Sequence, residues 1–270
     1  MTAADPDFEG LLTYEVEGDV AVITYNRPER RNAMSVPMYR AIVAAVEKAN
    51  ADESVGAMVF THAGPIFCAG VDLKAEREPK DPVTGVRPTV ATLGMANDTG
   101  WIQLMRRSKP SVAALNGVAV GLGATHVLAL DIRMGSPKAG FSFPFLAVGT
   151  MPEYGFSALL PRIVGFAAAM ELCLTSAKLD ADQSVARGLL SRVVPEASLR
   201  AEAVALASTL AKLPAMQTRL TRQLIHDNAA EPDINTVLTR ERDAFVALFR
   251  AQRAGQAAES AKGLNAGRFD

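Results

Sequence analysis

A strand followed by a glycine-bearing loop occurs twice in the first half of the sequence, and this repeated unit restricts the fold more than any other feature. The first strand spans residues 55–62 and precedes the loop 67–73, and the second spans 112–116 and leads into the loop 116–123. Continuous apolar strands of this kind are typical of a sheet that is buried on both faces. A strand, a long helix and another strand in succession predict a crossover connection. We therefore expect an α/β protein.

Other elements follow from apolar spacing and from turn residues. Ser35 is placed to cap the helix that follows it, because its hydroxyl can accept a hydrogen bond from the first turn. The expected elements are two strands within 16–25 turned at Gly18-Asp19, a helix over 36–50, a helical segment 89–108, a short helix over 121–130, a strand over 131–135, helices over 152–163 and 166–174, and helices within 199–213, 216–225 and 237–249. This order predicts a core of ββα units over residues 1–195 and a helical part over 196–270.

The composition excludes several classes of function. The 28 basic and 29 acidic residues nearly balance, so neither nucleic acid nor an acidic membrane surface is expected as a partner. Cys68 and Cys173 are too few for a disulfide framework or a zinc site, which favours the reducing cytoplasm and no bound metal. The stretch 111–130 is uncharged over twenty residues, but it contains Asn116, His126 and three glycines. A buried strand that runs into a buried helix explains this stretch better than a membrane span.

The two loops place small residues where each strand leads toward a helix. The first loop reads FCAGVDL (67–73) and the second reads NGVAVGLG (116–123). A helix N-terminus has unpaired N–H groups and the positive end of the helix dipole, and both suit an oxyanion. Small residues let a ligand approach the backbone closely. Two such loops that converge would form a two-donor oxyanion hole.

Several motifs, in the same order, resemble the enoyl-CoA hydratase/isomerase (crotonase) superfamily. They are NRPERRNAM (26–34), FCAGVDLK (67–74), KPSVAALNGVAVGLG (109–123) with DIR (131–133), PEYGFSALLPRIVG (152–165) and ARGLLSRVV (186–194). Together they extend over nearly the whole chain. The resemblance implies a crotonase-like spiral of ββα units, with C-terminal helices that form trimers or dimers of trimers.

The same resemblance assigns the site residues by position. It makes the backbone N–H groups of Val71 and Leu122 the oxyanion donors, although glycine is frequent in the family where Leu122 stands. The nucleotide end of coenzyme A would lie along residues 31–33, with Lys74 near its phosphates. Coenzyme A is then part of the substrate, and no separate cofactor is expected. The residues that would contact this acyl-CoA or enoyl-CoA thioester are Arg31, Ala33, Ala69, Gly70, Asp72, Lys74, Gly121, Thr125 and Phe145.

Two glutamates that the family's hydratases use are missing from this sequence. The first matching position is Thr125, two residues after the final glycine of the second loop. The second is Phe145, which follows Pro144. Hydration needs one group that deprotonates water and a proton donor for the α-carbon, and neither side chain can serve. The sequence therefore argues against efficient hydration.

Glu153 is the carboxylate that remains near the expected site. The segment FPFLAVGTMPEYG (143–155) is similar to that of peroxisomal-type Δ3,Δ2-enoyl-CoA isomerases, which carry a single catalytic glutamate at this position. Moving a double bond removes a proton from C2 and returns one to C4, so one carboxylate can serve both steps. The pattern also has a structural interpretation, because Thr150 and Glu153 could form a capping box with Pro152 in the first helical turn.

Other candidates have simple structural explanations. Asp72 is placed to cap a helix, His126 to be a hydrogen-bonded core histidine, and Cys68 to be a packing residue. Residues 76–88 hold three prolines and many charges, which predicts a surface segment or lid. The sequence thus predicts an enoyl-CoA isomerase-type enzyme with Glu153 as its acid/base. A hydratase-like enzyme with weak or different acyl-CoA chemistry, and a non-catalytic acyl-CoA-binding protein, are the alternatives.

Overall fold

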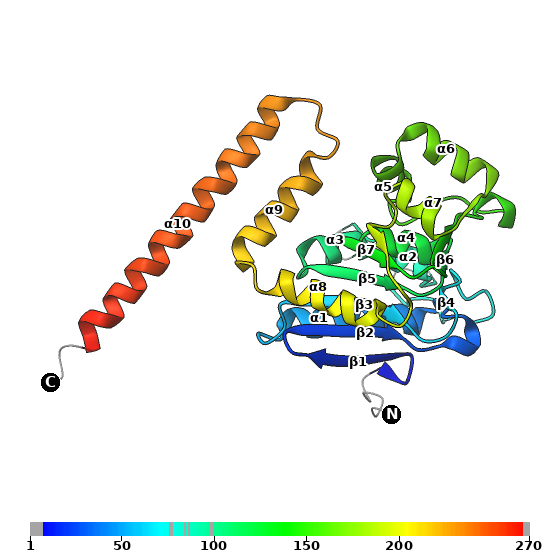
Figure 1. Ribbon diagram of the computed structural model, residues 1–270, viewed down its shortest axis with the longest axis horizontal. Coiled ribbons are helices and arrows are strands. Elements are labelled where there is room, and N and C mark those ends of the chain that lie inside the picture. The colour runs from blue at the N-terminus through cyan, green and yellow to red at the C-terminus, as the bar shows by residue number, and fades with distance from the viewer. Residues whose placement is uncertain (1–7, 76–77, 84, 86, 98–99, 267–270) are drawn as a thin grey trace. The chain divides into compact units, whose positions relative to one another are not determined.

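From β3 to β8, successive strands of the chain alternate between two sheets. The computed structural model describes residues 8–75, 78–83, 85, 87–97 and 100–266. The six-stranded sheet has the order β1-β2-β3-β5-β7-β10, of which Figure 1 labels β1, β2, β3, β5 and β7, and the four-stranded sheet has the order β4-β6-β8-β9. The strands are β1 (Leu12–Glu17), β2 (Val20–Tyr25), β3 (Ala57–His62), β4 (Ile66–Cys68), β5 (Ser111–Leu115), β6 (Val118–Val120), β7 (Ile132–Gly135), β8 (Gly140–Ser142), β9 (Lys178–Leu179) and β10 (Arg192–Val193).

Most strand pairs are parallel, as the expected α/β class requires. Antiparallel pairing joins β1 to β2, whose turn contains the predicted Gly18, and also joins β8 to β9. The pairs β3 and β4, β5 and β6, and β7 and β8 each give one strand to either sheet. This alternation is the ββα repeat that the sequence predicts, and the fold class is confirmed.

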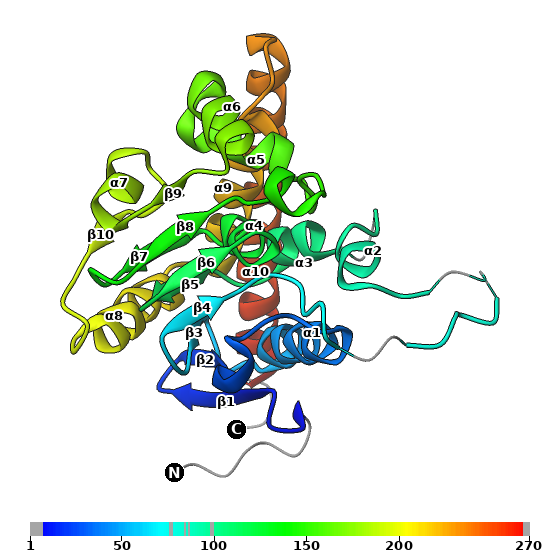
Figure 2. The ribbon, with the colours of Figure 1, turned by 90° about the vertical axis from the view of Figure 1, so that its right-hand side faces the viewer.

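Helices cover both faces of the six-stranded sheet. Alternate residues of β2 face opposite ways, so Ala21 and Ile23 pack in the core that contains α1, while Val20 and Val22 pack against α8. Figure 2 shows α1 and α8 on opposite sides of this sheet. The helices are α1 (Val36–Ala51), α2 (Val90–Gly94), α3 (Trp101–Arg107), α4 (Leu122–Leu128), α5 (Phe156–Val164), α6 (Phe166–Thr175), α7 (Ala181–Ala186), α8 (Leu199–Ala211), α9 (Ala215–Asn228) and α10 (Ile234–Ala266).

The predicted helix boundaries hold where local sequence decides them. Ser35 caps α1, and its hydroxyl accepts the N–H of Met38 at 3.3 Å. The expected helical segment 89–108 instead divides into α2 and α3. Of the surface segment expected over 76–88, residues 76, 77, 84 and 86 lie outside the described part, and its described remainder contains neither helix nor strand.

The chain divides into two compact units after Lys212. This boundary lies later than the expected one at residue 195, because α8 packs on the six-stranded sheet through Leu199, Ala203 and Ala207. The second unit contains α9 and α10, and Arg240 joins them by donating to the carbonyl oxygen of Asp227 at 3.0 Å. Among the described residues, no helix combines the length and the apolar character needed to cross a bilayer.

Candidate active site

The loop after β4 presents the backbone N–H of Val71, which has no partner in the described part of the chain. Val71 and Met34 form an isolated parallel bridge, in which the Met34 N–H donates to the Gly70 carbonyl oxygen (2.7 Å) and the Asp72 N–H donates to the Met34 carbonyl oxygen (3.0 Å). These bonds use the groups on either side of the Val71 N–H. Within the described residues, that N–H therefore remains free to bind a ligand.

Helix α4 begins at Leu122, directly after a turn that requires glycine. Gly121 has φ +51° and ψ −120°, a conformation that L side chains avoid. Its N–H donates to the Ser142 carbonyl oxygen on β8 (2.9 Å), which fixes the turn. The Leu122 N–H is the first of its helix and has no intrahelical acceptor. Elsewhere in the described chain it finds no acceptor either.

The two loops are in direct contact. A Cβ atom placed on Gly70 would lie 3.8 Å from the backbone nitrogen of Leu122. A Cβ atom placed on Gly123 would lie 2.7 Å from the carbonyl oxygen of Cys68. Glycine at both positions therefore lets the start of α4 approach the end of β4. Because Val71 directly follows Gly70, the two free N–H groups belong to one small region of backbone.

A buried ion pair holds the first loop. The Nη2 atom of Arg27 lies 3.0 Å from Oδ2 of Asp72, and Nη1 of Arg27 donates to the Ala33 carbonyl oxygen at 2.7 Å. The Asp72 carboxylate is only 5% exposed and also accepts the N–H of Lys74 at 3.0 Å. The expectation that Asp72 caps a helix is wrong, because its described neighbours form a turn and its carboxylate binds an arginine from a distant segment.

The residues expected to hold coenzyme A meet beside this loop. The Ala69 N–H donates to the Arg31 carbonyl oxygen at 3.1 Å, which joins the segment 26–34 to the end of β4. Asn32 is fully buried, and its side-chain amide donates to two carbonyl oxygens between β3 and β4 at 2.9 and 2.8 Å. The side chains of Arg31 and Lys74 are exposed. The two segments thus offer two exposed cations, which suit phosphate groups.

The two positions that would be glutamates in a hydratase hold buried neutral side chains. Thr125 is fully buried, and its hydroxyl donates to the Gly121 carbonyl oxygen at 3.1 Å. Phe145 is also buried, with its ring centroid 5.2 Å from that of Phe156. A Cβ atom on Gly121 would lie 3.9 Å from the Phe145 ring. The wall beside the second loop is therefore apolar and carries no acid.

Glu153 precedes α5 as a half-buried carboxylate. The helix begins at Phe156, its N-cap is Gly155, and no side chain caps it. The capping-box interpretation of Thr150 and Glu153 is therefore wrong. Tyr154 (φ +59°) and Gly155 (φ +69°) are both left-handed, and they turn the chain before the helix starts. Burial raises the pKa of Glu153, and its side chain makes no hydrogen bond or ion pair within the described chain.

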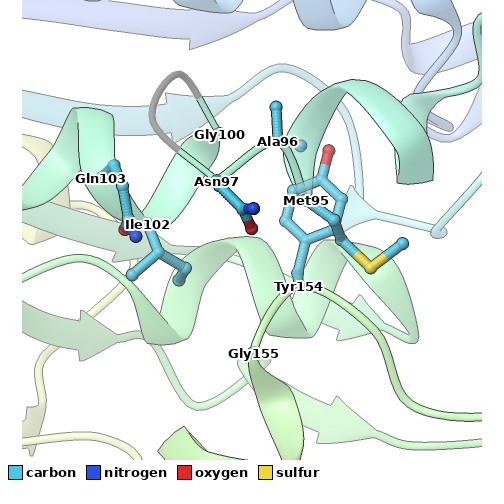
Figure 3. Close-up of a pocket in the computed structure, with 9 residues that line it drawn as sticks. Met95, Ala96, Asn97, Gly100, Ile102, Gln103, Tyr154 and Gly155 are labelled. Atoms are coloured by element: carbon cyan, nitrogen blue, oxygen red, sulfur yellow. The ribbon is translucent and has the colours of Figure 1, made fainter.

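A pocket of about 310 Å³ is lined by Tyr154 and Gly155, the two residues that follow Glu153. The segment from α2 to α3 forms its other wall, with Met95, Asn97 and Ile102. In Figure 3 the Asn97 side chain lies between Ile102 and the Tyr154 ring. Small-molecule pockets run from about 300 to 1,000 Å³, so this one suits a small group.

A model of the enoyl-CoA hydratase/isomerase family matches residues 15–265, which is nearly the whole chain. The chain belongs to this family. An Escherichia coli (strain K12) relative, 1,2-epoxyphenylacetyl-CoA isomerase, is 36% identical over 96% of this chain and 95% of its own. Enoyl-CoA delta isomerase 2 of Rattus norvegicus is 34% identical over 83% of this chain and 56% of its own.

A solved structure of a similar protein has the same fold as this chain. A Thermobifida fusca YX protein, provisionally named an enoyl-CoA hydratase and solved in complex with acetoacetyl-CoA, superposes with a TM-score of 0.75. It is 32% identical, and the match covers 91% of this chain and 97% of that chain. The protein is thus an acyl-CoA enzyme of the enoyl-CoA hydratase/isomerase family with the crotonase-type ββα fold that its motifs predict.

The sequence alone did not identify several residues of this site. Arg27 and Asn32 stand inside the NRPERRNAM motif, so the motif carried a signal, but their partners lie in distant segments. Tyr154 also stands inside a motif, PEYGFSALLPRIVG, but its partners Val90 and Gly94 lie in a distant segment. His126 is buried as expected, but within the described residues both ring nitrogens lack hydrogen-bond partners, and burial lowers its pKa to about 3. Burial raises the pKa of Cys68 to about 12, which keeps its thiol protonated and agrees with a packing role.

Proposed function

We propose that this protein shifts the double bond of an enoyl-CoA thioester through an enolate, with Glu153 as its single acid/base. The observation that carries the proposal is that Thr125 and Phe145 are buried neutral side chains, which leaves Glu153, a half-buried carboxylate whose pKa is raised by burial, as the candidate acid. A family hydratase uses two carboxylates, whereas double-bond migration needs only one group that accepts and returns a proton. The residues therefore favour migration over hydration.

The N–H groups of Val71 and Leu122 receive the thioester oxygen in this proposal. Both are free of other acceptors among the described residues, and their loops are in contact. When a proton leaves C2, negative charge collects on the thioester oxygen, and fixed N–H donors stabilise it more than they stabilise the neutral carbonyl. Each donor of this kind contributes about 10²–10³ in rate.

Glu153 carries the proton in both steps. Its carboxylate takes a proton from C2 of a 3-enoyl-CoA, and the electrons of that C–H bond form the dienolate. The dienolate then collapses as its C4 atom takes the proton back from the Glu153 carboxyl, which leaves a 2-enoyl-CoA and an ionised Glu153. No water is consumed and no other group needs to change its protonation state, so atoms and charge balance.

The substrate would be held at both of its ends. We place the nucleotide end of coenzyme A along Arg31, Ala33 and Ala69, with Lys74 near its phosphates, because the cations of these segments are exposed. We place the acyl chain in the pocket beside Tyr154, whose volume of about 310 Å³ suits a short chain. Binding at both ends would fix the thioester between the loops and Glu153.

One experiment separates this function from the two alternatives. Purified protein is offered a 3-enoyl-CoA and a 2-enoyl-CoA, with Glu153→Gln as the test variant and Glu171→Gln, an exposed carboxylate on α6, as its control. We expect migration with the first substrate, negligible hydration of the second, and a loss of about 10²–10⁴ in turnover for Glu153→Gln alone. Rapid hydration would favour the hydratase-like alternative. Binding without turnover of either thioester would favour the non-catalytic alternative. The neutral side chains of Thr125 and Phe145 are the reason for considering that alternative.

A further inference from the structure

Tyr154 has an unfavourable backbone conformation next to the proposed base. Its φ of +59° is in the left-handed region, and Gly155 after it is also left-handed at +69°. Glycine adopts this region readily, but a residue with a large aromatic side chain does so at a cost of about 1–3 kcal/mol. Such a conformation persists only where surrounding contacts determine it, and these contacts can be named for Tyr154.

Contacts from α1 and α2 fix the Tyr154 ring, and the His126 ring on α4 also lies near it, with centroids 6.5 Å apart. The residue is fully buried, and its hydroxyl donates to the Val90 carbonyl oxygen at 2.8 Å, at the start of α2. The ring lies against Gly94 so closely that a Cβ atom there would be 1.8 Å from Cζ of Tyr154. The ring of Tyr39 on α1 meets it edge-on, with centroids 6.2 Å apart. Helices α1 and α2 therefore determine where Tyr154 lies.

The orientation of Glu153 depends on this arrangement. Its side chain has no hydrogen bond or ion pair within the described chain, so no polar contact there holds the carboxylate, and its position depends on the backbone that carries it. That backbone enters the turn formed by Tyr154 and Gly155, in which the Phe156 N–H donates to the Glu153 carbonyl oxygen at 3.1 Å. A movement of the Tyr154 ring would rotate the peptide between residues 153 and 154 and displace the carboxylate.

The same ring forms a wall of the pocket in Figure 3. We infer that Tyr154 is a positioning residue, which holds the Glu153 carboxylate toward the substrate and links it to the pocket wall formed by α2. The inference rests on the proposed function, because it assigns Glu153 the proton transfer. Tyr154 itself moves no proton in this account, since its hydroxyl is bound to Val90.

The cleanest test keeps the ring and removes only its anchor. Tyr154→Phe leaves the shape of the pocket wall unchanged but loses the bond to Val90, so kcat for a 3-enoyl-CoA should fall about tenfold while KM stays the same. A misplacement of a reacting group by about 1 Å can cost as much as 10²-fold, so a partial loss is reasonable. The control is Tyr25→Phe, a buried tyrosine whose hydroxyl has no partner in the described chain, and it should match the parent.

A pH profile separates positioning from a general loss of structure. Because burial raises the pKa of Glu153, a carboxylate displaced toward water should return toward the ordinary value of about 4.3. The acidic limb of kcat should therefore move to lower pH in Tyr154→Phe. A lower melting temperature alone would not move this limb when the protein is assayed well below that temperature.

A second route perturbs the ring without changing residues 153 or 154. Gly94→Ala should displace the ring and lower kcat to a similar extent, whereas in a Tyr154→Gly background the same change should cost nothing further. The inference would be overturned if the losses in kcat caused by Gly94→Ala and by Tyr154→Gly were fully additive. It would also be overturned if Tyr154→Phe had the kcat and the acidic limb of the parent. If Glu153→Gln in the same assay retains the rate of the parent, the proposed function fails. If that variant is inactive while Tyr154→Phe is unchanged, only the positioning role fails.

Discussion

At the scale of single residues, Glu153 makes the stability of the molecule depend on pH. Burial raises its pKa, so the folded protein binds a proton more tightly there than the unfolded chain does. The ionised group then opposes folding at neutral pH, and this cost disappears as pH falls below the pKa of the unfolded chain, about 4.3. A carboxylate kept at such a cost is expected of a functional group.

Glu153→Gln should accordingly raise the melting temperature at pH 7–8, because it removes a half-buried charge. The gain should shrink as pH falls and vanish near pH 4, where the parent carboxyl is protonated. Scanning fluorimetry of both proteins from pH 4 to pH 8 measures this difference. A melting temperature that falls at neutral pH would show that the carboxylate has a stabilising partner, contrary to our description.

Single residues also show where sequence reasoning stops. Ser35 was predictable as a cap because its partner lies three residues away. Asp72 was not, because its carboxylate binds Arg27 from another segment. Thr150 and Glu153 have the residue types of a capping box, but the left-handed turn at Tyr154 postpones the helix, and contacts with α1 and α2 determine that turn. Local rules fail at residues whose conformation depends on distant parts of the chain.

At the scale of elements, α4 carries one of the proposed oxyanion donors, and its approach to β4 depends on Gly123. A side chain there would meet the Cys68 backbone, so Gly123→Ala should push α4 away and displace the Leu122 N–H. We expect kcat to fall by up to about 10²-fold and stability to fall by about 1–3 kcal/mol. Steady-state kinetics and urea unfolding measure the two effects.

The control for this variant is Gly165→Ala, which has a positive φ of +82° but open space around it. It should cost about 1 kcal/mol of stability through backbone strain, with kcat unchanged. The comparison separates loss of stability from displacement of α4. A Gly123→Ala protein with the kcat of the parent would show that Leu122 makes no essential bond.

The elements themselves were predictable to different degrees. Local apolar patterns predict β2, α1, β3, β5 and α4 close to where they lie. Strand β1 instead begins at Leu12, four residues before the expected start at residue 16. The helical segment 89–108 was expected to be continuous, but the helix is interrupted between α2 and α3. Gly94 packs on Tyr154, and Nε1 of Trp101 donates to the His126 carbonyl oxygen at 2.8 Å. Both partners lie well beyond the end of this segment, so no local pattern could reveal them.

At the scale of the whole molecule, the resemblance implies a homotrimer or a dimer of trimers, and this stays a prediction. Helix α10 leaves large apolar side chains exposed, among them Leu238, Phe245 and Phe249. Contiguous exposed apolar patches mark association surfaces, and the ring centroids of Phe245 and Phe249 lie 6.3 Å apart. The double variant Phe245→Asp/Phe249→Asp should therefore yield monomers in sedimentation velocity, whereas Gln252→Asp on the same helix should not. A parent that already sediments as a monomer would contradict the prediction.

The central claim is that one carboxylate moves a proton from C2 to C4, and deuterium tests it most directly. A 3-enoyl-CoA dideuterated at C2 is converted in ordinary water, and the 2-enoyl-CoA product is examined by NMR and mass spectrometry. We predict that part of the label arrives at C4 in the parent, and that Glu153→Gln forms product at least about 10²-fold more slowly. The proposal would be contradicted if Glu153→Gln formed product at the rate of the parent. The deuterium removed from C2 would in that case appear only in water and not at C4.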